Sequence, residues 1–300
     1  MLVWLPPDLA PADLGPLPET VRPAGFGTGD PAGVEVVVLA PPQRGDFAAR
    51  LPELTGLRLV QTLNAGIDWV PALPAGVTLC NSGDVHSGPV AEWIVGVILA
   101  MRRRLVDFAR RSDWDGAANT AFSAAAGTDD LADATVLVVG YGSIGRALHA
   151  RLTPFGAHVV GVRRGGPDTL ADLPALLPAA DVVVLLVPQT AQTTGLVDAA
   201  FLARMRPGAL LVNAARGGLV DTAALLAAVR AGHVRAALDV TDPEPLPAGH
   251  PLWAEPGVLV TPHTAGSVSR WRQRAARLVG AQLRRYAAGE PLDHRREAGY

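Results

Sequence analysis

The second half of the chain alternates short apolar runs with segments that have the spacing of helices. The runs are apolar on both faces, which is typical of parallel strands covered by helices on both sides. They are TVLVVG (135–140), HVVGV (158–162), DVVVLLVP (181–188), ALLVNAA (209–215), AALDV (236–240) and VLVTP (258–262), and helices are expected from Ser143, near 170–178, over 196–205 and over 221–232. The pattern predicts an open parallel α/β sheet.

The first hundred residues show the same alternation less regularly. Strands are expected at 34–41, 57–63 and 76–83, then a long helix over 90–111, a loose connection over 112–133 and, at the far end, an Arg-rich helix within 267–292 that packs back across the first domain. A chain of 300 residues has room for two domains. We expect one domain from 1–93 plus 282–300 and a second from 94–281.

Composition narrows the possible partners. The formal net charge is -2, so no basic field attracts nucleic acid or an anionic membrane. The longest nearly uncharged apolar run, 93–101, is too short for the roughly 20 residues that span a bilayer. The N-terminus lacks the basic start of a signal peptide, and the single cysteine, Cys80, follows an apolar run and reads as a buried thiol. We therefore expect a cytoplasmic protein that binds a small molecule, with no nucleic acid, membrane or metal.

Every basic side chain apart from histidine is arginine, because the sequence contains no lysine. This absence excludes Schiff-base chemistry and Walker-type phosphate binding.

The hexamer GYGSIG (140–145) lies between an expected strand and an expected helix. In that context Gly140 allows a tight turn, Gly142 lets a pyrophosphate approach the backbone, and Gly145 lets helix and strand pack closely. The phosphates would lie at the helix N-terminus, beside the three intervening residues, Tyr141, Ser143 and Ile144. The hexamer predicts dinucleotide binding; a purely structural turn is the alternative. It does not fit the serine-hydrolase pattern G-x-S-x-G, since Tyr141 precedes Gly142.

Three successive strand ends carry an arginine, a glutamate and a histidine. Arg216 precedes Gly217-Gly218, Glu244 stands between two prolines, and His263 follows Pro262. Each has a plain structural alternative: a solvated arginine, an exposed acidic turn, a satisfied histidine. Because ligands bind at the carboxyl ends of parallel strands, we favour a site in which Glu244 holds one ring nitrogen of His263 while the other faces a substrate anchored by Arg216. Cofactor contacts are also expected at Pro188, Ala214, Ala215 and Asp239.

GYGSIG, VNAARGGLVD, ALDVTDPEPLP and TPHTAG, in this order, resemble the D-isomer-specific 2-hydroxyacid dehydrogenases, and more closely their glyoxylate/hydroxypyruvate reductase-like branch. The resemblance implies a Rossmann-type doubly wound sheet inserted into a smaller flavodoxin-like α/β substrate domain. It also implies that Arg216 binds the substrate's carboxylate and carbonyl, that His263 is the acid/base and that Glu244 supports it. The formate dehydrogenases among these relatives have glutamine in place of Glu244, which argues against that activity.

The same resemblance extends to the first domain. The loop NAGID (64–68) is similar to one whose backbone amides, here at Ala65 and Gly66, hold the substrate carboxylate. VAEW (90–93) matches the start of an interdomain helix, and the helix over 90–111 implies a homodimer. The expected reaction transfers a hydride between NAD(P)H and a small 2-oxo or 2-hydroxy acid. The alternative is a dinucleotide-sensing scaffold with little turnover.

The cofactor preference is read from HVVGVRRGG (158–166). An acid that accepts hydrogen bonds from the ribose 2′-hydroxyl of NAD is expected at the end of this strand, yet no Asp or Glu stands between Gly145 and Asp168. Arg163 and Arg164 occupy that place, and two guanidinium groups can bind a 2′-phosphate. We expect NADP(H) to be preferred, with NAD(H) possible. Ordinary solvated arginines are the alternative.

Overall fold

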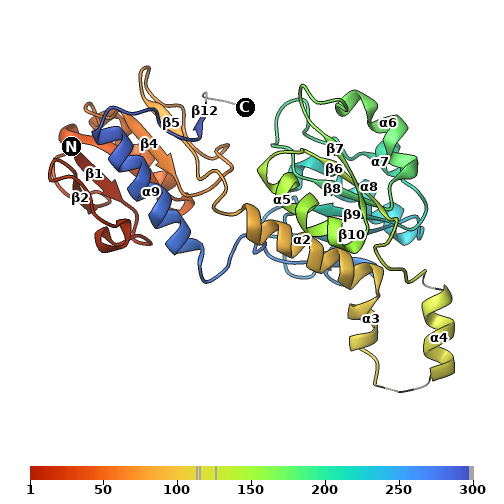
Figure 1. The fold of residues 1–300 in the computed structure, drawn as a ribbon. Coiled ribbons are helices and arrows are strands. Elements are labelled where there is room, and N and C mark those ends of the chain that lie inside the picture. Colours follow the sequence, from red (N-terminus) through yellow and green to blue (C-terminus); the bar gives the residue numbers. More distant parts are fainter. Residues whose placement is uncertain (113, 115, 126, 297–300) are drawn as a thin grey trace. The chain divides into compact units, whose positions relative to one another are not determined.

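A computed structural model describes all residues of the chain except 113, 115, 126 and 297–300. Its contacts divide the chain into two compact units, Met1–His86 with Val268–Tyr300 (unit 1) and Ser87–Ser267 (unit 2) (Figure 1). The divisions fall after His86 and Ser267 instead of after 93 and 281. The reason is that the buried residues of helix α2 (Ser87–Arg102) join the core of unit 2, while those of helix α9 (Trp271–Ala287) join the core of unit 1.

Unit 2 is built on a parallel sheet in the order β11-β10-β9-β8-β6-β7. Its strands are β6 (Thr135–Val139), β7 (His158–Val162), β8 (Val182–Leu185), β9 (Ala209–Asn213), β10 (Val234–Leu238) and β11 (Val258–Val260), and its covering helices are α2, α5 (Ser143–Leu152), α6 (Leu173–Leu176), α7 (Ala199–Arg204) and α8 (Thr222–Arg230). Successive residues of each strand face opposite sides, so Val136 and Val138 pack with α2 and α5, whereas Leu137 and Val139 pack with α6, α7 and α8. The strand order reverses at β6, and such a reversal marks the ligand-binding edge of an open α/β sheet.

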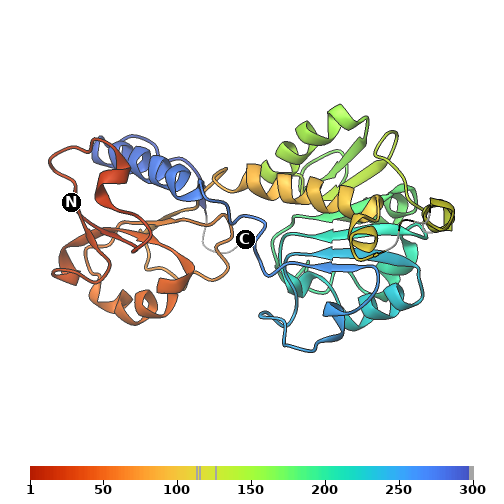
Figure 2. The same ribbon diagram turned by 90° about the horizontal axis from the view of Figure 1, so that it is seen from below.

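Unit 1 has its own sheet, in the order β12-β5-β4-β3-β1-β2, parallel except for β12. The strands are β1 (Leu2–Leu5), β2 (Arg22–Gly25), β3 (Val34–Leu39), β4 (Leu59–Thr62), β5 (Thr78–Cys80) and β12 (Arg295–Arg296). Helix α9 covers one face and α1 (Arg44–Arg50) the other, as Figure 2 shows. The sequence pattern did not predict β1 and β2, because Pro6 ends β1 after four residues and β2, with the sequence RPAG, has no apolar run.

Short 3-10 helices complete both units. They occupy Pro11–Leu14, Pro31–Gly33, Pro41–Gln43, Leu51–Glu53, Thr153–Phe155, Leu170–Asp172, Leu177–Ala179, Gly217–Leu219 and Pro251–Trp253. Within the described residues, no helix has the length and apolar character needed to cross a bilayer.

Two expectations for the first part of unit 2 were wrong. The helix expected over 90–111 breaks after Arg102, since Arg104 adopts a left-handed conformation with φ of 54° before α3 (Leu105–Ala109) begins. The stretch 112–133, expected as a loose connection, contains α4 (Gly116–Ala125). Figure 1 shows α3 and α4 extending together from the body of unit 2, and Phe108 and Phe122 join them edge to face with ring centroids 5.2 Å apart. We call this pair of helices the arm.

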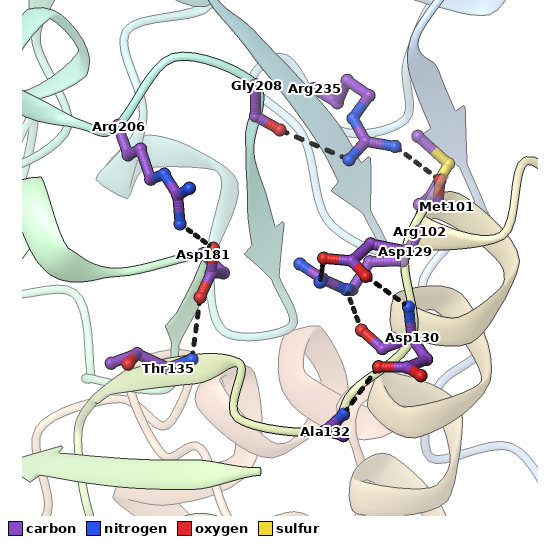
Figure 3. Close-up of polar contacts among 10 residues, drawn as sticks. All are labelled: Met101, Arg102, Asp129, Asp130, Ala132, Thr135, Asp181, Arg206, Gly208 and Arg235. Atoms are coloured by element: carbon purple, nitrogen blue, oxygen red, sulfur yellow. Dashed lines mark hydrogen bonds and ion pairs between the residues drawn. The ribbon is translucent and has the colours of Figure 1, made fainter. Parts of the chain in front are cut away.

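A buried arginine, Arg102, and a half-buried one, Arg235, fix the base of the arm (Figure 3). Arg102 is 7% exposed; its Nε donates to the Asp130 carbonyl at 2.9 Å and its Nη2 to the Asp129 carboxylate at 2.9 Å. Arg235, on β10, donates to the Met101 carbonyl at 2.5 Å. Burial and the nearby charges of Arg104 and Arg102 lower the pKa of Arg235 to about 10, so it stays charged at neutral pH. Both ends of the arm are thus held at one charged, hydrogen-bonded point of unit 2.

Candidate active site

The glycine-rich turn joins β6 to α5 at the carboxyl edge of the unit 2 sheet. Gly140 has φ of 105°, and a Cβ there would lie 2.5 Å from the backbone of Leu186 and Val187. Gly142, the N-cap of α5, has open space where a Cβ would stand, so an incoming group can reach the backbone. The first N–H groups of a helix lack intrahelical acceptors and attract anions. The turn therefore suits the pyrophosphate of a dinucleotide.

The side chains within the turn face the protein. The Tyr141 ring lies over β7, where a Cβ on Gly161 would come within 2.4 Å of it, and its hydroxyl is 2.5 Å from His149 Nδ1 on α5. Ser143 accepts a hydrogen bond from the Ser87 hydroxyl at 3.1 Å, and Ile144 packs on the core under α5. The Tyr141 N–H donates to the Val162 carbonyl at 2.9 Å, so the N–H groups of Ser143 and Ile144, in the first turn of α5, are the ones at the position expected for the phosphates. Gly161 in mid-strand is explained by the ring that lies over it.

Arg163 and Arg164 follow the end of β7, as the sequence indicated, and both side chains are exposed. A turn forms here, with Gly166 N–H donating to the Arg163 carbonyl at 3.1 Å and Gly165 at φ of 67°. A Cβ on Gly166 would lie 2.8 Å from Arg163 Cγ, so the glycine leaves room for that side chain. Across the described part of the chain, neither guanidinium pairs with a carboxylate, which leaves both available to an anionic ligand.

The loops after β9 and β10 are in direct backbone contact. A Cβ on Gly217 would lie 1.9 Å from the Thr241 carbonyl oxygen, so only glycine permits this approach. Arg216, just before it, donates from Nη1 to the Ala215 carbonyl at 2.7 Å, and its own carbonyl accepts from Asn213 Nδ2 at 2.8 Å. Arg216 is thereby fixed beside the loop that carries Glu244.

Glu244 in turn contacts His263. Its Oε1 lies 2.6 Å from His263 Nδ1, and the two side chains are 41% and 52% exposed. With Nδ1 held by the carboxylate, the ring orientation is fixed, and Nε2 is the nitrogen left to exchange a proton with a ligand. Unit 2 therefore brings together Glu244 and His263 by direct contact, and Arg216 through the adjoining backbone.

Asp239 contributes a feature that sequence reasoning missed. It was expected only to contact the cofactor, but its carboxylate is 3% exposed and organises the loop around His263. Oδ1 accepts from Thr261 Oγ1 at 2.6 Å and Thr264 N–H at 2.8 Å, and Oδ2 accepts from Ala265 N–H at 2.9 Å. The Asp239 carbonyl also accepts from His263 N–H at 2.7 Å. The sequence did hold one signal for this role: Asp239 stands in an apolar strand, and acidic residues are almost never fully buried unless they are paired.

These hydrogen bonds to Asp239 explain how the backbone of His263 is held in a strained conformation. Its φ is 54°, in the left-handed region that L side chains rarely adopt and that costs about 1–3 kcal/mol. The hydrogen bonds that Thr261, Thr264 and Ala265 donate to Asp239 hold the loop on both sides of His263 and offset that cost.

The other residues that were expected to contact the cofactor or the substrate lie in loops that follow strands. Pro188 follows β8, and its carbonyl accepts from Thr193 Oγ1 at 2.6 Å. Ala214 packs partly on the sheet, and Ala215 N–H donates to Asn213 Oδ1 at 3.1 Å. These positions adjoin the carboxyl edge of unit 2. Ala65 and Gly66 belong to unit 1, in the loop after β4.

Comparison with known proteins decides the family. The family described as D-isomer specific 2-hydroxyacid dehydrogenase, NAD binding domain, matches residues 95–265, more than half of the chain. The chain belongs to the D-isomer-specific 2-hydroxyacid dehydrogenases. This confirms the resemblance in the sequence, the expected α/β fold and an oxidoreductase that uses NAD(P).

Curated and solved relatives of this dehydrogenase cover most of its length. Glycerate dehydrogenase of Methylorubrum extorquens is 32% identical over 266 residues, or 86% of this chain and 84% of the relative. Glyoxylate reductase of Thermofilum pendens is 35% identical over 250 residues, or 78% and 73%. The crystal structure of a D-isomer specific 2-hydroxyacid dehydrogenase from Xanthobacter autotrophicus, in complex with NADPH and MES, has a TM-score of 0.80 at 32% identity and covers 99% of this chain and 97% of that one.

The hydrogen bonds to Asp239 predict how a substitution at Thr261 changes the stability of the protein. Thr261→Val keeps the side-chain shape but removes the hydroxyl that donates to Asp239, and a hydrogen bond to a charged group contributes about 1.5–3 kcal/mol. We expect the free energy of unfolding to fall by about that amount in urea denaturation. Thr261→Ser, which keeps the donor, is the matched control and should lose less. Equal stability of Thr261→Val and the unsubstituted protein would show that the bond contributes nothing.

Proposed function

We propose that this dehydrogenase reduces a small 2-oxo acid of the glyoxylate or hydroxypyruvate kind to the 2-hydroxy acid, with His263 as the general acid. The observation that carries the proposal is the 2.6 Å contact between His263 Nδ1 and Glu244, beside the loop that fixes Arg216. The name of the glyoxylate reductase of Thermofilum pendens supports the substrate class. Glutamate at position 244, in place of the glutamine of formate dehydrogenases, supports reduction of a carbonyl over oxidation of formate.

The residues have separate roles in the proposed reaction. The guanidinium of Arg216 binds the substrate through two parallel hydrogen bonds, which a planar carboxylate and adjoining carbonyl accept. Glu244 holds the His263 ring and pairs with it when the ring carries a proton, and Nε2 delivers that proton to the carbonyl oxygen. The nicotinamide of a bound cofactor supplies the hydride. We place the cofactor on the main chain of residues 140–145, with further contacts at Pro188, Ala214, Ala215 and Asp239.

The first test is removal of the proton donor. For His263→Ala we expect turnover to fall at least ~100-fold, because general acid catalysis contributes roughly 10²–10⁴-fold, while the Kd of the reduced cofactor changes little. The assay screens glyoxylate, hydroxypyruvate, pyruvate and phenylpyruvate. His158→Ala is the matched control, since that exposed ring stands at the start of β7, at the other edge of the sheet.

Two outcomes would contradict the proposal. Turnover of His263→Ala near that of the unsubstituted enzyme would remove His263 from the reaction. Tight cofactor binding by the unsubstituted protein, with none of the four acids reduced, would favour the dinucleotide-sensing scaffold instead.

We further propose that NADP(H) is preferred over NAD(H), because the exposed Arg163 and Arg164 stand where an acid would otherwise meet the ribose. The related enzyme of Xanthobacter autotrophicus was solved with NADPH, which supports the proposal. A phosphate held by charge-assisted bonds gains about 1.5–3 kcal/mol, equivalent to roughly tenfold or more in affinity.

The cofactor prediction follows from those charges. The Arg163→Ala/Arg164→Ala double variant should lose roughly tenfold or more of the ratio of kcat/KM for NADPH to that for NADH, measured with one accepted acid at fixed salt. Arg22→Ala/Arg44→Ala removes two exposed arginines of unit 1 and controls for net charge. An unsubstituted enzyme that uses NADH as well as NADPH would show that the arginines do not read the 2′-phosphate.

We also propose a homodimer that forms through α2 and the arm. Trp114, between α3 and α4, is 98% exposed and Leu105, on α3, is 53% exposed, and we expect a partner chain to cover these large apolar side chains. Light scattering at micromolar concentration should give twice the mass of one chain, and Trp114→Ser/Leu105→Ser should shift the mass toward a monomer. A monomeric unsubstituted protein would refute the proposal.

A further inference from the structure

The side chain of Tyr141, the second residue of the glycine-rich turn, contacts two neighbouring elements at once. A Cβ on Gly161 of β7 would lie 2.4 Å from Cδ2 of the ring, and a Cβ on Gly145 of α5 would lie 3.3 Å from the same atom. The ring therefore fills a space that exists because both positions lack a side chain. One turn further along α5, His149 Nδ1 lies 2.5 Å from the hydroxyl, and the two ring centroids are 5.9 Å apart.

The backbone of Tyr141 is joined to the end of β7 as well. Its N–H and that of Gly140 both donate to the buried Val162 carbonyl, each at 2.9 Å. The N–H of the same peptide group belongs to Arg163, and it donates to the Asp168 carbonyl at 3.1 Å. One peptide group thus connects the turn that is expected to bind the pyrophosphate with the residue that is expected to bind the 2′-phosphate.

These backbone bonds need the ring to give a fixed geometry. Two hydrogen bonds to one oxygen allow the end of β7 to pivot about that oxygen. The ring opposes this movement because it fills the space between β7 and α5, and a close-packed strand cannot shift into filled space. The contact with His149 keeps the ring in place. The Tyr141 side chain therefore sets the spacing between the turn and Arg163.

This spacing matters for a ligand that has two anionic groups. Such a ligand gains most when its two binding points match its own dimensions, because the second contact then costs little further freedom. NADPH carries a pyrophosphate on the 5′ side of its adenosine ribose and a phosphate on the 2′ side, whereas NADH carries only the pyrophosphate. A wrong spacing would therefore weaken the binding of NADPH more than that of NADH.

We propose that Tyr141 is a positioning residue for the choice of cofactor. Held by His149, its side chain sets the spacing at which the turn and Arg163 bind the two phosphate groups of NADPH together. The inference rests on the proposed preference for NADP(H). It adds a residue that determines the preference through the backbone of β7, without binding the 2′-phosphate itself.

The test is the ratio of the Kd of NADH to the Kd of NADPH, measured by calorimetric titration of the full chain at fixed salt. For Tyr141→Ala we expect this ratio to fall roughly fivefold or more, because the gain from simultaneous binding is lost. A general loss of folding would lower the fraction of chains that bind either cofactor and would leave the ratio unchanged.

A double-mutant cycle tests the contact with His149. Tyr141→Phe removes only the hydroxyl, and His149→Phe keeps an aromatic ring without its nitrogens. We expect each to lower the ratio roughly two- to threefold, as for one hydrogen bond, and the double variant to lower it no further, because both changes remove the same bond. Tyr286→Phe, which removes a half-buried hydroxyl from α9 of unit 1, is the matched control and should leave the ratio unchanged.

A variant of β7 reaches the same space from the other side. Gly161→Ala leaves Tyr141 and His149 in the sequence, but its Cβ would displace the ring. Alanine otherwise suits the interior of a strand better than glycine, so we expect a folded protein in which the ratio falls as in Tyr141→Ala. Gly96→Ala, on α2 with open space around its Cβ, is the matched control.

A second pair of ligands confines the effect to this edge of the sheet. Adenosine 2′,5′-bisphosphate carries a phosphate for each of the two binding points, and adenosine 5′-monophosphate lacks the 2′-phosphate. The ratio of their Kd values should fall in the same variants. Neither titration requires turnover, so a chain that binds these ligands but reduces no acid would refute only the proposed reaction.

Three outcomes would overturn the inference. If the unsubstituted protein binds NADH as tightly as NADPH, the cofactor preference and the inference are both wrong. If it prefers NADPH, and Tyr141→Ala and Gly161→Ala keep that preference, the inference alone is wrong. Losses that add in the double variant would show that the hydroxyl and His149 act separately, and the positioning of Tyr141 by His149 would then be refuted.

Discussion

The geometry of the candidate active site depends on one buried carboxylate. Asp239 lies at the end of β10 and accepts three hydrogen bonds from residues 261–265, so the loop after β11 is folded around it. A buried carboxylate without partners would be very costly, and this cost gives the loop a single low-energy arrangement. His263, placed within that arrangement, reaches Glu244 although its own backbone is strained. The contact between His263 and Glu244 is thus a consequence of the hydrogen bonds that Asp239 accepts.

Glycines supply the second constraint, because they let backbones meet where side chains would not fit. Gly217 brings the loop after β9 against Thr241, and Gly140 brings the nucleotide turn against Leu186 and Val187. These glycines were visible in the sequence because each stands in a short recognisable motif, GYGSIG or ARGG, although the backbone that each one meets lies far along the chain. Gly161 was not explained by its neighbours in sequence, because the ring that lies over it belongs to Tyr141, twenty residues earlier.

The elements that the sequence predicted most accurately are those set by periodicity and by local capping. The limits of β7 agree to the residue and β6 ends one residue before the expected run, while α8 begins within the expected 221–232, where Asp221 caps it by accepting from Ala223 and Ala224 N–H. The weak strands β1 and β2, the short helix α4 and the break at Arg104 were missed, because tertiary packing holds them and no local pattern marks them. The supporting role of Asp239 was hidden for a similar reason: the residues that donate to its carboxylate lie 22 to 26 residues away.

The insertion of unit 2 within unit 1 also bears on how the chain folds as it is synthesised. The inner face of β3 and β4, with Val36, Val38 and Leu59, is covered by Ala275 and Val279 of α9, which leave the ribosome more than 200 residues later. Unit 2 is continuous in sequence and can complete its core first. Until α9 arrives, the nascent chain presents an uncovered apolar sheet face, the kind of surface that chaperones bind and that aggregates when synthesis stalls.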